Sequence, residues 1–385
     1  MVFCCVGFPF LEEASLKTFR YKIGSKPLSS PARALLRKRS FSPPERASTR
    51  TRTLLVVSGS RKRSSTSARD DKTKPRYAGS ASPPLEPTYR ISPQQLLKYE
   101  RKGYVCTRGL FTEDELSRFR PAVEGATSRL ELKALRQRVS VLCPGVDATQ
   151  LQSKEEAQQL LATRAVEEVG FLQYINLHQT DQTIDHLLRS PRVAAAAAAL
   201  LGCNRVRLYQ SCAFLKNPGH GPTNWHSDLN MVPLDTNQFV TLWIPFRAIS
   251  QNNDTGLEFA CGSHRDFALP YWHKMEGYDL ATRGYKIESA GAMAMGDVTW
   301  HAGWTLHCAP SAPKRGPRRL ALTASYFADG AQVLPRGKQE AGGRRMVRYP
   351  HTEDEQSYLD WLQMLRPGDV AGGYNLPLVF PTDAV

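Results

Sequence analysis

Two His-x-Asp triplets in this 385-residue chain have the spacing of a metal-binding pair. His226 and Asp228 form the first, and His264 and Asp266 form the second. On a strand, residues i and i+2 point to the same face, so an imidazole and a carboxylate can converge on one ion. A second histidine from a distant strand would complete a 2-His-1-carboxylate triad, which leaves positions open on non-haem Fe(II) for a co-substrate and O2. Such a triplet is common by chance, so its context decides its meaning.

The residues after position 296 contain the histidines that could complete the triad. Both His301 and His307 qualify by position, and Arg319 follows His307 by twelve residues at the start of an expected strand. A buried guanidinium requires a partner, and arginine binds a carboxylate through two parallel hydrogen bonds. A dicarboxylic keto acid would then chelate the metal with one end and meet Arg319 with the other. Strand alternation adds small side chains to the face of Arg319, namely Ala321, Thr323 and Ser325.

Other titratable or nucleophilic residues carry weaker signals. His220 and His273 fall in expected loops near the mouth of the fold, where each contacts either substrate or solvent. Cys308 directly follows His307, but no base and orienting partner are suitably spaced, so we interpret it as a small packing residue. The eight cysteines contain no CxxC pair, which favours free thiols in a reducing compartment over disulfides.

The elements that must position these residues fall into two groups along the chain. Before residue 202 the pattern is mainly helical, with helix-capping sequences that begin at Ser92, Thr112, Ser153 and Ser190. We expect helices from residue 92 to about 101, from 112 onward, from 153 to about 168 and from 190 to 202, and a short strand at 103–107.

After Gly202 the pattern changes to short segments rich in β-branched and aromatic residues, separated by Gly, Pro, Asn and Asp. We expect strands at 205–215, 239–245, 257–260, 291–300 and 320–327. Helices first and then many short strands predict the α+β class, with an antiparallel sandwich or barrel as the core.

The net charge of +15 is concentrated at one end of the chain. Residues 1–80 hold 18 Lys and Arg against 5 Asp and Glu, a net of +13, so the remaining residues carry only +2. A body so close to neutrality argues against a nucleic-acid enzyme with a basic groove. We therefore expect a small molecule as the partner, and the sequence does not indicate an oligomeric state. No run of about 18 apolar residues is present, so we expect no transmembrane helix.

The leader itself is rich in Arg and Ser and poor in acids, which is typical of an organellar transit peptide for a plastid or a mitochondrion. The alternatives are a disordered tail on a cytoplasmic protein, or a nuclear import patch at residues 37–39 or 61–63. We expect the leader to span residues 1–88 and one catalytic domain to span residues 89–385.

The ordered combination of motifs in the body resembles the phytanoyl-CoA dioxygenase family. It consists of Trp-His-Ser-Asp at 225–228, Trp243, Gly-Leu-Glu-Phe at 256–259, Gly-Ser-His at 262–264, Gly-Asp-Val at 296–298, His307 and Arg319. The resemblance extends over about residues 90–350 and includes the helical lead-in. It implies an Fe(II)- and 2-oxoglutarate-dependent oxygenase on a double-stranded β-helix, or jelly roll, with supporting helices before it.

The resemblance also implies roles for individual residues. His226, Asp228 and His307 would bind Fe(II), and Arg319 would bind the far carboxylate of 2-oxoglutarate. In the family the Gly-Ser-His segment is a separate signature, which favours His226 and Asp228 over the second triplet. The distance to Arg319 favours His307 over His301.

Two further residues are implied to line the co-substrate site. Gln210 belongs to a segment, with Ser211 and Lys216, that is similar to the ectoine hydroxylase branch, in which the glutamine contacts the co-substrate. Phe214 stands where that branch has Asn. Trp243 matches a tryptophan that lines the co-substrate pocket in relatives.

With these roles the chain would use O2 and 2-oxoglutarate to oxidise a small organic substrate, and it would release succinate and CO2. Asp228 favours hydroxylation or another oxidation over halogenation, because halogenating relatives lack the carboxylate. The insert between residues 265 and 289 would choose the substrate through its rings, namely Tyr271, Trp272, His273, Tyr278 and Tyr285. The alternatives are a non-catalytic jelly-roll binding protein with a relic metal site, and a cupin-like hydrolase or isomerase that uses another divalent metal.

Overall fold

The computed structural model describes residues 85, 89–250, 255–266, 280, 283–334, 340–341, 344–345, 361 and 364–381. Apart from Leu85, the expected leader at 1–88 lies outside the described residues. So do four of the rings expected to choose the substrate, namely Tyr271, Trp272, His273 and Tyr278.

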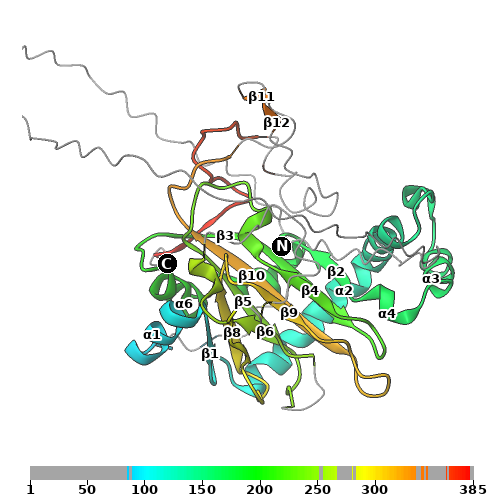
Figure 1. Ribbon diagram of the computed structural model, residues 1–385, viewed down its shortest axis with the longest axis horizontal. Helices are drawn as coiled ribbons and strands as arrows, with labels where there is room; N and C mark the ends of the chain where they lie inside the picture. Colours follow the sequence, from blue (N-terminus) through cyan, green and yellow to red (C-terminus); the bar gives the residue numbers. More distant parts are fainter. Residues whose placement is uncertain are drawn as a thin grey trace, which may run out of the picture. The chain divides into compact units, whose positions relative to one another are not determined.

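Two antiparallel β-sheets form the centre of the fold (Figure 1). The larger sheet has the strand order β1 (Tyr104–Thr107), β8 (Val298–Ala302), β5 (Phe239–Pro245), β10 (Arg319–Ala328), β3 (Val206–Lys216) and β13 (Leu378–Phe380), and β2 (Leu172–Ile175) also pairs with β3. The smaller sheet has the order β4 (Thr223–His226), β9 (His307–Ala309), β6 (Glu258–Ala260) and β7 (Ile287–Ser289). Two further short strands, β11 (Glu340–Ala341) and β12 (Arg344–Arg345), pair with each other. This arrangement confirms the predicted α+β class and double-stranded β-helix.

The helices α1 to α6 lie before β3 in the sequence, as predicted, and β1 and β2 lie between them. They are α1 (Pro93–Lys102), α2 (Glu113–Leu142), α3 (Lys154–Ala162), α4 (Val166–Val169), α5 (Gln182–Leu188) and α6 (Pro191–Leu201). The expected capping boxes form at Ser92 and Thr112, where each hydroxyl accepts a hydrogen bond from the backbone N–H three residues later. Four 3-10 turns connect these elements, namely η1 (Ala148–Gln150), η2 (Leu177–Gln179), η3 (Asp228–Met231) and η4 (Ser263–Arg265).

The helix expected to run from residue 153 to about 168 is wrong in its extent. Helix α3 ends at Ala162, and a separate one-turn helix, α4, begins at Val166. After Ala162, the Thr163 hydroxyl donates to the carbonyl of Leu160, and the Arg164 guanidinium donates to the carboxylate of Glu168. These side-chain bonds compete with continuation of the helical backbone.

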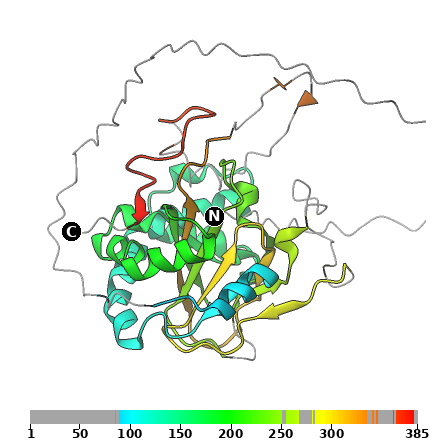
Figure 2. The same ribbon diagram turned by 90° about the vertical axis from the view of Figure 1, so that its left-hand side faces the viewer.

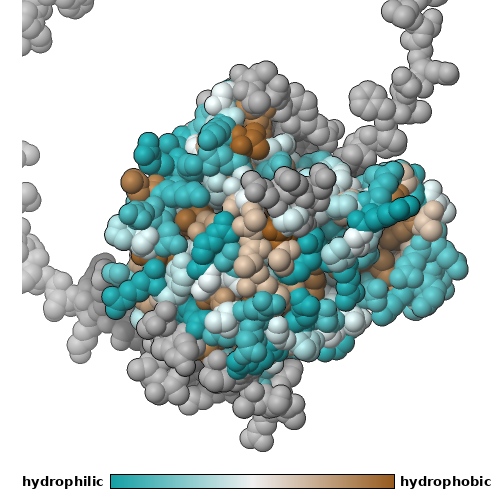
Figure 3. All heavy atoms as spheres, turned by 90° about the horizontal axis from the view of Figure 1, so that it is seen from below, coloured by the Kyte–Doolittle hydropathy of each residue, from teal (hydrophilic) through white to brown (hydrophobic). Residues whose placement is uncertain are grey.

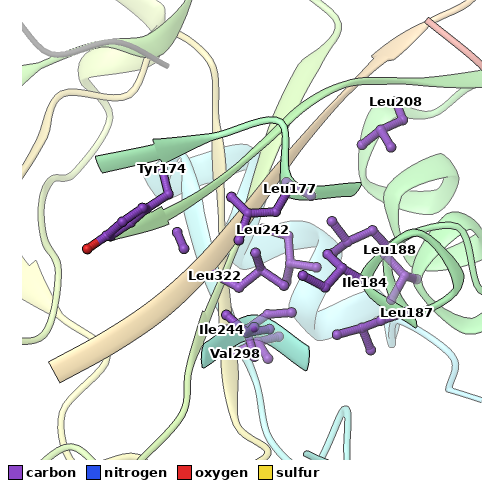
Figure 4. Packing of buried hydrophobic residues seen from close by; sticks show 14 of the residues in the cluster. Tyr174, Leu177, Ile184, Leu187, Leu188, Leu208, Leu242, Ile244, Val298 and Leu322 are labelled. Atoms are coloured by element: carbon purple, nitrogen blue, oxygen red, sulfur yellow. The ribbon is translucent and has the colours of Figure 1, made fainter. Parts of the chain in front are cut away.

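The apolar core lies between the helices and one face of the larger sheet. Leu242 of β5 and Leu322 of β10 pack against Ile184, Leu187 and Leu188 of α5 (Figure 4). Helix α6 contacts β3, β5, β10 and β13 on this same side, where the helices gather in Figure 2. We call this the helix-covered face. Because side chains alternate along a strand, the neighbouring residues of the same strands point to the opposite face, toward the smaller sheet.

Strand β8 begins later than predicted, at Val298 rather than near residue 291. Gly296 and Asp297 form a turn before it. Gly296 has a φ of +106°, and a Cβ at this position would lie 2.0 Å from the carbonyl oxygen of Phe111. The Asp297 carboxylate accepts hydrogen bonds from the backbone N–H groups of Gly109 and Ala294. The turn therefore fastens the start of β8 to the segment before α2.

The described residues contain no helix that is both long and apolar enough to cross a membrane. On the face seen in Figure 3, hydrophilic residues surround smaller hydrophobic areas. Such a mixture is ordinary for a surface in contact with water.

A candidate metal centre between the two sheets

Two histidines of the smaller sheet face each other across a strand pair. His226 is the last residue of β4, His307 is the first of β9, and the two are register partners. Their ring centroids are 4.2 Å apart. These strands were not predicted, because each has only three or four residues and their pairing joins segments about eighty residues apart in sequence.

Asp228 joins these histidines from a turn rather than from a strand. Strand β4 ends at His226, and Asp228 is the first residue of η3, so the expectation that both lie on one strand is wrong. The convergence expected from their spacing nevertheless forms. Asp228 Oδ1 lies 3.9 Å from His226 Nε2 and 3.7 Å from His307 Nε2, and one ligand atom from each of the three residues lies within 4.8 Å of the others.

Backbone carbonyls orient both imidazoles toward the common point. The Nδ1 atom of His226 is 2.7 Å from the carbonyl oxygen of Asn224, and that of His307 is 3.0 Å from the carbonyl oxygen of Thr305. A carbonyl only accepts hydrogen bonds, so each Nδ1 carries the proton and each Nε2 keeps its lone pair for a metal. This is the donor arrangement that a divalent ion needs.

The Asp228 carboxylate is completely buried, and its two oxygens have different surroundings. Oδ2 accepts a hydrogen bond from Thr241 Oγ1 at 2.6 Å and lies 3.1 Å from His301 Nε2. Oδ1 faces the two Nε2 atoms and accepts no hydrogen bond from the residues that the structure describes. A buried acceptor without a donor is costly, and a metal ion at this point would satisfy it. The donor set therefore fits Fe(II).

The protonation states also suit a metal. Burial alone would raise the pKa of the Asp228 carboxyl, but the imidazoles of His307, His301 and His226 hold it well below its usual range. Burial lowers the pKa of both His226 and His307. The centre therefore combines a carboxylate anion with two neutral imidazoles, the forms in which these groups bind metals.

A narrow cavity extends from these residues between the two sheets. Its wall on the larger sheet is formed by Phe214, Lys216, Thr241, Trp243, His301, Arg319 and Thr323, and its wall on the smaller sheet by Thr223, His226, His307, Cys308 and Ala309, with Phe171 and Leu257 at the sides. Both sheets therefore contribute side chains to one site.

Two buried cations lie in this cavity on neighbouring strands. Arg319 of β10 and Lys216 of β3 are register partners, and they are 3% and 1% exposed. The Arg319 guanidinium lies 5.5 Å above the Trp243 ring and donates from Nε to Thr255 Oγ1 at 3.1 Å. The Lys216 ammonium donates to the carbonyl of Gly221. This arrangement favours an anionic group as the occupant of the cavity.

Most of the sequence-predicted residues meet in this region. His226, His307, Arg319 and Trp243 all line the cavity beside Asp228. Gln210 is buried on β3 opposite Ser325, on the face toward the site, but it is not among the lining residues; its Nε2 lies 3.5 Å from Cys212 Sγ.

The other histidines considered as metal ligands or substrate contacts have different positions or partners. His264 belongs to η4, and its Nε2 lies 3.1 Å from the carbonyl oxygen of Glu100, away from the triad. His301 does reach the centre, but it contacts Asp228 on the oxygen that faces away from the other two histidines. His220 is buried rather than solvated, and burial lowers its pKa to about 4.

Sequence reasoning missed Thr241 and the burial of Lys216 in the cavity wall. Thr241 precedes Trp243 by two residues in β5, so alternation would have placed it on the same face. Lys216 follows five consecutive apolar or small residues in its strand and is itself buried, which no local signal indicated.

Comparisons with known proteins give a family for the chain and solved structures that are similar to it. The family described as Phytanoyl-CoA dioxygenase (PhyH) matches residues 99–319. Among solved structures, the chain is similar to the non-heme alpha ketoglutarate dependent carbocyclase SnoK from nogalamycin biosynthesis, with 21% identity, a TM-score of 0.54 and coverage of 76% of this chain and 99% of that one. EctD from S. alaskensis, solved with 2-oxoglutarate and 5-hydroxyectoine, gives 18% identity, a TM-score of 0.48 and coverage of 72% and 95%. A search of curated proteins gave no match. At such identity the likeness to SnoK shows the fold.

Proposed function

The chain belongs to the phytanoyl-CoA dioxygenase family of Fe(II)- and 2-oxoglutarate-dependent oxygenases, and on that premise we propose that His226, Asp228 and His307 are its iron ligands. The observation that carries this proposal is the convergence of two Nε2 atoms on a buried carboxylate oxygen that accepts no hydrogen bond from the described residues. A facial triad of this kind leaves coordination positions for the co-substrate and O2.

The bound iron supplies the oxidative decarboxylation of 2-oxoglutarate by O2 to succinate and CO2, coupled to oxidation of a substrate C–H bond. The protein's part is to hold the reactants and exclude water. The three ligands are at most 11% exposed at the side chain, and the cavity walls are mostly apolar or hydrogen-bonded.

Arg319 would bind the far carboxylate of 2-oxoglutarate, and Lys216 would contribute a second positive charge beside it. Both are buried at neighbouring positions, and the Trp243 ring supports the guanidinium. A buried guanidinium held over a ring can form two parallel hydrogen bonds with a carboxylate. Gln210 stays a proposed co-substrate contact from the resemblance alone.

The outcome proposed is hydroxylation, or another oxidation, of a small organic substrate. Asp228 occupies the position whose carboxylate is missing in halogenating relatives. The substrate would be chosen by the insert at residues 265–289. Of its rings, Tyr285 is described, and its hydroxyl donates to the carboxylate of Asp266.

Ligand binding without oxygen tests the ligand and co-substrate assignments together. Under anaerobic conditions the full chain is expected to bind 2-oxoglutarate tightly with Fe(II) and weakly after chelation of the metal. His226→Ala should lose metal-dependent binding, and His186→Ala, which changes an exposed histidine of α5, should keep it. Equal binding of 2-oxoglutarate with and without metal would contradict the proposal and favour a binding module or another metal chemistry.

We also propose that residues 1–88 direct the chain to a plastid or a mitochondrion and that the catalytic domain spans residues 89–385. The support is composition, since 13 of the 15 net charges lie in the first 80 residues. Fusion of residues 1–88 to a fluorescent reporter is expected to place the reporter in one of these organelles. A reporter that stays in the cytoplasm or enters the nucleus would contradict the targeting proposal.

A further inference from the structure

The two oxygens of Asp228 are held in unequal ways, and this asymmetry has a consequence for the metal. Oδ2 accepts a hydrogen bond from Thr241 Oγ1 at 2.6 Å and another from His301 Nε2 at 3.1 Å. Oδ1 is the atom that faces His226 and His307. A carboxylate with both oxygens available can bind a metal through one oxygen or through two.

Thr241 is placed by a polar row that crosses the larger sheet. Register pairing puts Gln210, Ser325, Thr241 and His301 side by side on strands β3, β10, β5 and β8, all on the face toward the site. Ser325 Oγ lies 3.2 Å from Thr241 Oγ1. Since Thr241 is 1% exposed, its hydroxyl is fixed by the sheet and not by solvent.

His301 is fixed by rings on two sides. Its ring centroid lies 4.1 Å from that of His307 and 5.7 Å from that of Phe259. Phe259 in turn stacks on Tyr104, with centroids 4.2 Å apart and planes within 8°. The imidazole therefore has little freedom to turn away from Asp228.

We propose that Thr241 and His301 are positioning residues that restrict Asp228 to a one-atom metal ligand through Oδ1. The inference rests on the proposed function. Two hydrogen bonds to a buried anion are strong, and together they use both lone pairs of Oδ2, so a metal bond to this oxygen would displace at least one of them. Two imidazoles and one carboxylate oxygen fill three of six positions, which leaves two for the keto acid and one for O2. A two-atom carboxylate would take one of these.

The competing interpretation is that Thr241 and His301 only fill a buried polar layer. Under that interpretation, substitutions would change stability and leave the metal environment of the folded protein as it is. Under ours, they change how the metal is bound. The two interpretations therefore differ in a spectroscopic property and not in activity.

The decisive variants remove one donor and keep its volume. Thr241→Val deletes the hydroxyl, and His301→Leu deletes the ring N–H. Thr241→Ser and His301→Gln retain a donor, the glutamine amide reaching about as far as Nε2. His186→Gln on exposed α5 is the matched control for a changed histidine. Co(II) is the probe, because its visible absorption reports coordination number without requiring turnover.

In the full chain, Thr241→Val and His301→Leu are expected to weaken Co(II) binding by roughly 10–100-fold, the usual effect of removing a partner of a metal ligand. Their Co(II) spectra should shift, and the further spectral change that 2-oxoglutarate causes in the unsubstituted protein should shrink. Thr241→Ser and His301→Gln should restore affinity and spectrum, and His186→Gln should match the unsubstituted protein.

Each result has a distinct meaning. If Thr241→Val and His301→Leu are folded by circular dichroism and keep the unsubstituted affinity and spectrum, the positioning roles are overturned while the proposed function stands. If the unsubstituted chain binds neither Co(II) nor 2-oxoglutarate, the proposed function is overturned and the inference with it. If His301→Leu fails to fold, the pair Thr241→Val and Thr241→Ser decides alone.

Discussion

The two faces of the larger sheet are built from the same strands but held together by different forces. On β10, Leu322 and Tyr326 point to the helix-covered face, and Thr323 and Ser325 point to the site. All of these residues are at most 3% exposed. Burial is therefore equal on both faces, and what differs is how the buried atoms are satisfied.

On the helix-covered face apolar side chains pack against one another without directional bonds, so their shape and volume determine how much they stabilise the fold. On the site face each polar side chain must find a particular partner, as Thr241 does with Asp228. The comparison suggests that changes on the first face act on stability, and that changes on the second act on chemistry. Five substitutions, at four places in the molecule, test this division.

The largest effect is expected at the centre of the site face. Asp228→Ala removes the only anion among the proposed iron ligands, so formation of succinate from 2-oxoglutarate without substrate should fall to the background rate. His226→Ala should do the same. Succinate is measured by chromatography, with equal amounts of folded protein in the samples of each variant and of the unsubstituted chain. Undiminished turnover in either variant would refute the assignment of these ligands.

On the helix-covered face, Leu322→Ala is expected to reduce the free energy of unfolding by about 2–5 kcal/mol, because it leaves a cavity against helix α5. Succinate formation per folded molecule should change less than about threefold, since a packing change on the opposite face of the sheet leaves the polar partners in place. Urea unfolding followed by circular dichroism measures the first quantity. A loss of turnover without a loss of stability would break the comparison.

Arg319→Leu should act on the co-substrate. Loss of a charged hydrogen-bonding pair costs about 1.5–3 kcal/mol, which corresponds to a rise of roughly 10–100-fold in the KM for 2-oxoglutarate. Affinity for the metal alone should not change, because Arg319 belongs to the other end of the cavity wall. If metal affinity falls as much as 2-oxoglutarate affinity, the two ends of the site are not separable as we describe.

A buried histidine outside the site gives the smallest effect and a pH dependence. Ser211 Oγ accepts from the backbone N–H of His178 and lies 2.8 Å from its Nδ1. Burial lowers the pKa of His178 to about 3. As pH falls below the unfolded value of about 6.5, the unfolded chain binds the proton first, so stability is lost at about 1.4 kcal/mol per pH unit.

His178→Gln should remove this loss. The difference in unfolding free energy between His178→Gln and the unsubstituted chain should therefore shift by about 2 kcal/mol between pH 7 and pH 5, in favour of the variant. Urea unfolding at the two pH values measures it. A difference that is independent of pH would show that His178 takes up its proton in the folded state.

The sequence predicted correctly the features that depend on contacts between residues close together in the chain. The capping boxes at Ser92 and Thr112 depend on contacts three residues apart, and both form. Strands β5 and β10 are long and rich in β-branched or aromatic residues, and their predicted bounds differ from the observed ones by at most one residue. The family resemblance likewise depended on motifs in a fixed order and is confirmed.

The remainder of the site depends on contacts between distant segments. Strands β4 and β9 are short and partly polar, and they exist because they pair with each other. His301 looked like a competing ligand, since only the three-dimensional arrangement shows that it meets the outer oxygen of Asp228. No spacing rule connects Thr241 to Asp228, thirteen residues earlier in the chain, until the sheet is formed.

Strand β1 has a role that its four residues do not suggest. It lies at the edge of the larger sheet and pairs with β8 from Tyr104 to Thr107, opposite the stretch that ends at His301. A chain that lost its first 107 residues would lack β1 and would expose the hydrogen-bonding groups of β8 as an open edge, which invites pairing with another molecule. The position at which any leader could be removed is thus bounded from within the fold, because a cut that removes β1 would turn β8, the strand of His301, into a site of aggregation.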